Sequence, residues 1–277
     1  LGGGAIQGGT VTARPGGRLV VAYRRFESSG TLDGVTLDTD MIVEPYAQVD
    51  ARNGLTLSNG HKIILGNQSE GANLFFRGDS QTLGGNGEVV FGGGSGGQVG
   101  AGLNVGATLT MDAGVTIQSG AGGGSGQIHV NCAFLNRGTI KADEAGQTVT
   151  LWGRGLLTNI GTLSAQSGGT LNLAGKCRTA QGTFQNNGGV INFSGSLDNS
   201  NATLTLNATT GLLNLLTGGT ISGGTVTASA GGGLVLMKGT DWRPITLDGV
   251  TLDTDLTVDN EVELRVLQMQ LLRLDFR

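Results

Sequence analysis

Three segments of alternating apolar and polar residues recur in the middle of the chain at a nearly constant spacing. They are TVTLWG at 148–153, TLNLAG at 170–175 and VINFSG at 190–195, spaced 22 and 20 residues apart. A second recurring element precedes each of them, namely GTI at 138–140, GTL at 161–163 and GTF at 182–184. Because two different segments share a period of roughly 20–23 residues, the pattern indicates a repeat architecture.

The alternation predicts which side chains face inward. Successive side chains of a strand point to opposite sides, so one apolar set comprises Val149, Leu151, Leu171, Leu173, Ile191 and Phe193. The opposite, mostly polar set comprises Thr148, Thr150, Thr170, Asn172, Val190 and Asn192. If each period is one coil, equivalent strands stack in parallel about 4.8 Å apart, and the apolar rows form one inner column. The sequence therefore predicts an all-β, single-stranded parallel β-helix (β-solenoid) of about 20–29 residues per coil, with three short strands in each.

The composition supports a folded, turn-rich β protein. Gly accounts for 53 of 277 residues without the three-residue period of collagen, and 38% of residues are hydrophobic. Gly and Asn can supply the positive φ that solenoid corners need. The candidate corner residues are Asn136, Gly138, Asn159, Gly161, Asn187 and Gly188. At eleven to thirteen coils, the stack should be on the order of 55–60 Å long.

A second, longer repeat joins the two ends of the chain. TLDGVTLDTD at 31–40 returns at 246–255, an offset of 246 − 31 = 215, and GGTVTA at 8–13 returns at 223–228 with the same offset. We therefore divide the chain into one unit at 1–215 and the continuous start of a second unit at 216–277, and we interpret the protein as a piece of a longer array. The two copies match until Val43 and Val258, after which the sequences diverge.

Charge and hydropathy argue against two classes of partner. The net charge is −4 and no basic run occurs, which argues against nucleic acid. No window of about 18 apolar residues exists, so we expect no membrane span.

The pattern N-x-G-T-[IL]-x-A followed by an alternating strand and Gly stands here as NRGTIKADEAGQTVTLWG at 136–153 and NIGTLSAQSGGTLNLAG at 159–175. It resembles the repeats of filamentous-haemagglutinin-like adhesins. GGTISGGTVTA with TLDGVTLDTDLTV, within 218–258, is similar to very large repetitive bacterial surface proteins. The resemblance implies a right-handed parallel β-helix in an extracellular or cell-surface location, with a structural or adhesive role. It transfers no catalytic residue.

Two pairs of carboxylates are the main candidates for chemistry. If LDTD is a strand, Asp38 and Asp40 share one face, with Leu37 and Thr39 opposite, and Asp253 and Asp255 do the same. A calcium site would need further oxygens, which Asp33 and Asp248 would have to supply. In sequence, only Arg243 among basic residues lies near either pair, which argues against polysaccharide cleavage. We interpret the pairs as solvated outer residues, with calcium binding as the remaining chemical alternative.

The histidines and cysteines suggest no site. His61 and His129 are expected on the surface of different coils, without a catalytic triad. Cys132 and Cys177 are 45 residues apart, so two coils should separate them by about 9.6 Å, too far for a disulfide. No catalytic, cofactor-binding or metal-binding residue is therefore assigned, and we expect no cofactor and no enzymatic activity.

Three other segments need an interpretation. The Gly-rich segments at 91–102 and 119–128 read as long corner turns of adjacent coils. The T-x-T triplets do not stack into an ice-binding ladder, since Thr148–Thr150 faces Thr170–Asn172 and then Val190–Asn192. The tail at 262–277 lacks Gly, and we favour a divergent cap or interface over a decayed repeat.

The sequence thus predicts a structural or adhesive segment, either a stiff scaffold or a self-associating filament module. Its partners would be further copies, other surface proteins or glycans. The alternative is a carbohydrate-binding or carbohydrate-processing β-helix, which a cluster of outward aromatic and acidic residues on one face would favour. Trp152 and Trp242 look sparsely placed for sugar stacking.

Overall fold

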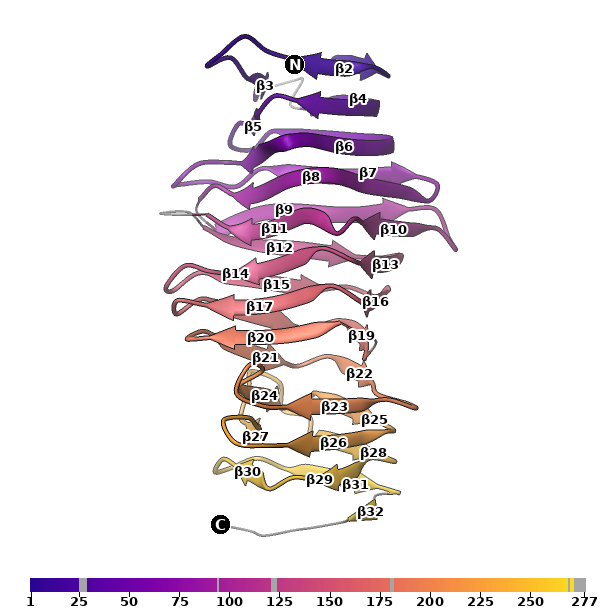
Figure 1. The fold of residues 1–277 in the computed structure, drawn as a ribbon, viewed down its shortest axis with the longest axis vertical. Coiled ribbons are helices and arrows are strands. Elements are labelled where there is room, and N and C mark those ends of the chain that lie inside the picture. Colours follow the sequence, from indigo (N-terminus) through magenta and orange to yellow (C-terminus); the bar gives the residue numbers. More distant parts are fainter. Residues whose placement is uncertain (25–28, 94, 121–123, 180–181, 269, 272–277) are drawn as a thin grey trace.

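The chain winds into a rod of stacked parallel β-coils, with its two ends at opposite ends of the rod (Figure 1). The computed structural model describes residues 1–277 except 25–28, 94, 121–123, 180–181, 269 and 272–277. The described residues form strands and turns without any helix, in about 11 turns of about 23 residues each. The ladders between the described strands are parallel, as expected for a β-solenoid, and one isolated bridge, between Gln166 and Gly188, is antiparallel.

Each coil has three faces, here named A, B and C in chain order. Face A contains β1 (Ala5–Gln7), β7 (Asn73–Gly78), β9 (Ser95–Leu103), β12 (Ser125–Val130), β15 (Thr148–Trp152), β18 (Thr170–Leu173), β21 (Val190–Phe193), β24 (Leu212–Leu216), β27 (Gly233–Met237) and β30 (Leu256–Val258). Face B contains β2 (Thr10–Thr12), β10 (Thr108–Met111), β13 (Ala133–Asn136), β16 (Leu156–Asn159), β19 (Lys176–Arg178), β22 (Ser196–Asp198), β25 (Thr220–Ser222), β28 (Ile245–Asp248) and β31 (Leu264–Leu267).

Face C completes each coil. It contains β3 (Leu19–Val21), β5 (Met41–Val43), β11 (Gly114–Ser119), β14 (Thr139–Ala142), β17 (Thr162–Gln166), β20 (Thr183–Asn187), β23 (Thr203–Leu206), β26 (Thr225–Ala228), β29 (Thr251–Asp253) and β32 (Gln270–Leu271). Three long strands bend around corners: β4 (Ser29–Asp38) covers A and B, β6 (Gln48–Leu65) covers all three faces, and β8 (Gln81–Phe91) covers B and C.

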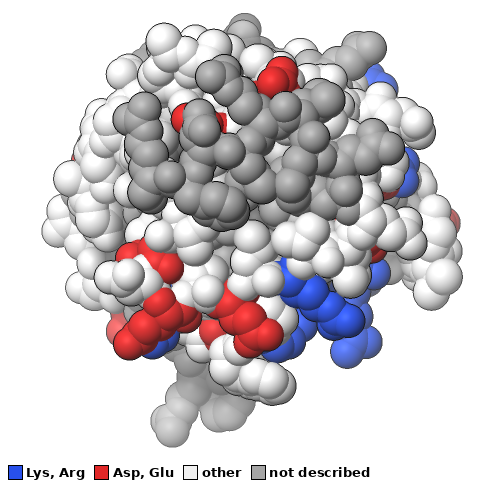
Figure 2. All heavy atoms as spheres, turned by 90° about the horizontal axis from the view of Figure 1, so that it is seen from below, with Lys and Arg blue, Asp and Glu red and all other residues white. Residues whose placement is uncertain are grey.

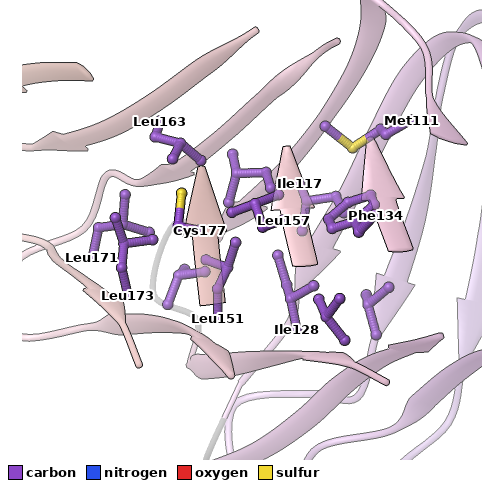
Figure 3. Close-up of a cluster of buried hydrophobic side chains, with 14 of the residues drawn as sticks. Met111, Ile117, Ile128, Phe134, Leu151, Leu157, Leu163, Leu171, Leu173 and Cys177 are labelled. Atoms are coloured by element: carbon purple, nitrogen blue, oxygen red, sulfur yellow. The ribbon is translucent and has the colours of Figure 1, made fainter. Parts of the chain in front are cut away.

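The interior is a column of apolar side chains, one layer per coil. On face B, Phe134 pairs with Leu157, which pairs in turn with Cys177, so these side chains stack along the rod axis (Figure 3). The six positions predicted to face inward are all buried: Val149, Leu151, Leu171, Leu173, Ile191 and Phe193. Burying a side chain of this size contributes about 1.5–3 kcal/mol, so the continuous column is the main source of stability.

The backbone repeats with the 215-residue offset even where the sequence does not. Tyr46 and Asn53 have φ of 63° and 53°, and their counterparts Glu261 and Gln268 have φ of 63° and 49°. Positive φ is uncommon for non-Gly residues. Its recurrence therefore shows that the two coils keep the same backbone conformation at positions where their sequences differ. The described part of the tail forms β31 and β32, which pair with β28 and β29. It therefore continues the solenoid as a diverged coil; residues 269 and 272–277 lie outside the described residues.

The two copies of TLDGVTLDTD lie on different faces of the rod. Leu32 belongs to face A, and nine successive pairings lead from β4 to β27 along that face. Leu247, its counterpart, belongs to β28 on face B. The 215 residues thus correspond to nine coils and one further face, so the two identical segments lie on different faces although they hold the same position in the two units.

The prediction that both Gly-rich segments are corner turns is wrong in one respect. They do lie in adjacent coils, since Gln98 pairs with Gln127. However, parts of both form strands β9 and β12. A Cβ built on Gly126 would lie 2.1 Å from Phe91 Cγ, so Gly at this strand position makes room for a buried aromatic ring.

Candidate functional site

The first carboxylate pair faces outward, as predicted. Leu37 and Thr39 are only 0% and 3% exposed, whereas Asp38 and Asp40 lie on the outer side where β4 ends. The alternation of a strand thus places both carboxylates on the same side of the chain.

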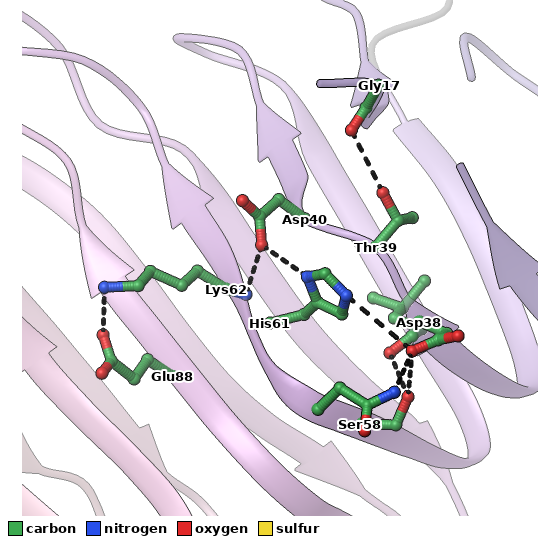
Figure 4. A network of polar contacts seen from close by, with 10 residues as sticks. Gly17, Asp38, Thr39, Asp40, Ser58, His61, Lys62 and Glu88 are labelled. Carbon is green, nitrogen blue, oxygen red and sulfur yellow. Dashed lines mark hydrogen bonds and ion pairs between the residues drawn. The ribbon is translucent and has the colours of Figure 1, made fainter. Parts of the chain in front are cut away.

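The structure corrects the expectation that no basic residue lies near this pair. His61, one coil further on, places Nδ1 2.9 Å from Oδ1 of Asp40 and Nε2 3.8 Å from Oδ1 of Asp38 (Figure 4). Ser58 Oγ and Asn59 Nδ2 also donate hydrogen bonds to Asp38, at 2.9 and 2.6 Å. Asp40 and His61 are 21 residues apart, which is the length of one coil. This spacing was the signal in the sequence from which the contact could have been predicted.

These contacts keep the two carboxylates ionised. Hydrogen bonds from Asn59 and Ser58 lower the pKa of Asp38, and the backbone N–H of Lys62, at 3.0 Å, lowers the pKa of Asp40. A carboxylate held in its charged form by neighbouring donors is a poor proton donor near neutral pH. The arrangement links two successive coils through side-chain contacts.

The second carboxylate pair has different surroundings. Asp253 and Asp255 are exposed and line a recess of about 500 Å³ beside the Gly-rich turn at 228–233. The counterparts of Ser58, Asn59 and His61 are Arg273, Leu274 and Phe276, which lie outside the described residues.

The described residues around the two carboxylate pairs do not form a group that could hold a metal. Within the part of the chain that the structure describes, no three His, Cys, Asp or Glu side chains are grouped so that they could hold a metal. Asp33, proposed as a helper, accepts a hydrogen bond from Asn53 Nδ2 at 2.6 Å. Calcium binding therefore has no additional support beyond the paired carboxylates.

The two cysteines are separate thiols, as expected from their spacing. Both are free and buried. Burial raises the pKa of Cys177 to about 12, so this thiol behaves as an apolar core group.

Face A carries an outer column of amide side chains that is interrupted only by Thr150 among its described members, here called the amide column. Successive coils place Gln48, Asn73, Gln98, Gln127, Thr150, Asn172, Asn192 and Asn214 in register. Asn192 donates to Asn172, and Asn214 donates to Asn192, both at 3.0 Å. This outcome confirms the predicted outward polar ladder and extends it along most of the rod.

A second outer column on face A, here called the ring column, lies two residues further along each strand. Asp50, Phe75, Gly100, His129 and Trp152 are paired in register. The column continues with the residues that follow the paired Leu173, Phe193 and Leu215, namely Ala174, Ser194 and Leu216. His129 and Trp152 are stacked with ring centroids 3.9 Å apart and planes 10° apart. Arg77 lies over the Phe75 ring, 4.7 Å from its centroid. Trp152, which was expected to be sparsely placed for sugar stacking, thus has an aromatic neighbour in the preceding coil.

The ring column is interrupted next to Trp152. The following two positions hold the small side chains of Ala174 and Ser194, and Leu216 comes next. A recess of about 800 Å³ adjoins Trp152 and Ala174, and a second of about 620 Å³ extends over Ala174 and Ser194 to Arg243. We call this combined hollow the Trp152 recess. Sequence reasoning missed it because the register of unequal coils decides which side chains meet.

Comparisons with known proteins identify no relative. No family model matches the chain, and no curated protein or solved structure is detectably similar to it. Among the described residues, the structure contains no helix long and apolar enough to span a membrane.

Proposed function

We propose that this chain is a stiff segment of an extracellular, repetitive surface protein, with a structural or adhesive role and no enzymatic activity. The observation that carries the proposal is the parallel stacking of about 11 turns around one apolar column. In such a solenoid each coil contacts only its neighbours, so added units lengthen the rod without changing its core. The sequence resemblance to adhesin repeats supports the surface location.

Self-association is part of the proposal, because an exposed edge of parallel strands can pair with another chain. Seen from the C-terminal end, charged side chains gather toward one side of the outline, while much of the rest is uncharged or not described (Figure 2).

Two measurements test this function. Small-angle scattering of the purified chain should give a rod with a length on the order of 55 Å, and intact producing cells should expose the segment to antibody and to added protease. A compact sphere, or a segment protected on intact cells, would contradict the scaffold or the surface location, respectively.

Carbohydrate binding is a second candidate, and the exposed indole of Trp152 beside the amide column favours it. Carbohydrate processing receives no such support, because the Asp40–His61 contact lies several coils away, at the corner between faces B and C. A scaffold that also binds glycan would fit the adhesive form of the proposal.

A further inference from the structure

We infer that the Trp152 recess binds an anionic polysaccharide, with one pyranose ring stacked on the exposed face of the indole. The inference rests on the carbohydrate-binding candidate above and names its ligand class. Three features carry it: a fixed aromatic ring and a column of amides on face A, and an excess of cations beside them.

The indole of Trp152 is held in place with one face open. Its Nε1–H donates to Gln127 Oε1 at 3.0 Å, and His129 covers one side of the ring system. Burial lowers the pKa of His129, so this imidazole is neutral at neutral pH and stacks without a charge. The other side faces Ala174, whose methyl group leaves the recess open, and Trp152 remains 38% exposed. A rigid, half-exposed aromatic ring offers apolar contact area at little cost in side-chain entropy.

The amide column supplies hydrogen-bonding groups beside this ring. Asn172 and Asn192 line the recess together with Ser194. Each amide has two donor hydrogens and an oxygen with two lone pairs, and the ladder contacts between Asn172, Asn192 and Asn214 use only some of them. The remaining groups can bind the hydroxyls of a sugar whose apolar face lies on the indole.

The charges around the recess select an anionic ligand. Arg154 lines the recess and is exposed. Lys176, in β19 of face B, is exposed and lines an adjoining hollow together with Ala174 and Arg243. Neither Arg154 nor Lys176 has an ion-pair partner among the described residues. Arg243 also lines the recess, paired with Asp241 at 2.6 Å. In a chain of net charge −4, these cations attract carboxylate or sulfate groups locally. Because the amide and ring columns both follow the rod axis, we expect the polysaccharide to lie along the rod.

The test uses the full chain carrying Trp242→Phe, which leaves Trp152 as the single tryptophan. Its fluorescence is titrated with oligogalacturonate, with a heparin oligosaccharide and with a neutral cello-oligosaccharide of matched length. We expect saturable changes with at least one anionic oligosaccharide, weakened by added salt, and none with the neutral one. Equal binding of the neutral chain would overturn the anionic ligand class, and the absence of any binding would overturn the site.

Variants locate the binding. By calorimetry, Trp152→Ala should weaken the anionic oligosaccharide about tenfold, and Asn172→Ala and Arg154→Gln should also weaken it. Tyr46→Ala, an exposed aromatic on a distant corner, is the matched control and should bind normally. Scattering on every variant separates the two proposals: an intact rod that binds no glycan refutes the ligand but leaves the scaffold standing.

Discussion

Leu32 and Leu247 occupy the same position of an identical ten-residue segment, yet they lie on different faces of the solenoid. Both are fully buried. Leu32 stacks along face A and Leu247 along face B. The segment therefore specifies strands and the turn between them, which any face of the coil can accommodate. A 215-residue unit that adds nine coils and one face would rotate each successive unit of an array by about one third of a turn.

The contacts of Asp40 predict a loss of stability in acid. Because the pKa of Asp40 is lowered in the folded state, its contribution is present above about pH 3.8, the ordinary value, and is lost as the pH falls through the folded pKa. Asp40→Asn should lower the free energy of unfolding at pH 7 by less than about 1 kcal/mol, since the side chain is half exposed. Denaturant titrations at pH 7 and pH 2.5 check this.

The matched control is Asp255→Asn, the equivalent carboxylate in the second copy. It should change the stability less than Asp40→Asn at pH 7. An equal effect of the two substitutions, or an Asp40→Asn effect that persists unchanged at pH 2.5, would contradict the role of the His61 and Lys62 contacts.

Ser167 predicts a stabilising substitution. This exposed residue has φ of 50°, a conformation that costs a non-Gly residue about 1 kcal/mol. Ser167→Gly should therefore raise the free energy of unfolding by up to about 1 kcal/mol, whereas Ser196→Gly, within strand β22, should lower it by about 0.5–1 kcal/mol. Thermal unfolding of both variants checks this. If Ser167→Gly does not stabilise the protein, the backbone at residue 167 is not strained.

A substitution at Gly126 should destabilise the protein. Ala at this position would force its Cβ against the Phe91 ring, and overpacking of this kind typically costs about 1–3 kcal/mol. Gly233→Ala is the control, because its nearest neighbour is the tip of the exposed Leu212 side chain, 3.2 Å away. Adding Phe91→Leu to Gly126→Ala should recover part of the loss in a denaturant titration; no recovery would rule out the clash as its cause.

The thiol of Cys177 should be unreactive in the folded protein. With a pKa of about 12, only about one molecule in 10,000 carries the thiolate at pH 8. Mass spectrometry after maleimide treatment should show modification of Cys177 only once denaturant is added. Rapid labelling under native conditions, at the rate of free cysteine, would place this residue outside the core.

The sequence predicted the architecture well because local alternation decides which side chains point inward. Val149, Leu171 and Ile191 were assigned correctly from their period alone, and their pairing follows it. The stack of His129 on Trp152 and the contact of His61 with Asp40 were missed. Both depend on the length of the intervening coil, which varies from 19 residues between Ser29 and Gln48 to 29 between Gln98 and Gln127. A local sequence pattern does not determine which residues of neighbouring coils are paired. The face that the chain reaches after 215 residues depends on the summed lengths of all the coils in between.

The most direct test of the account is electron microscopy of a tandem protein containing three 215-residue units. Each unit should lengthen the rod by about 45 Å, and a Fab bound to the same epitope in each unit should project in three directions about a third of a turn apart. Rods that do not lengthen with unit number would contradict the continuous solenoid. Fabs that all project from one side would contradict the rotation between units.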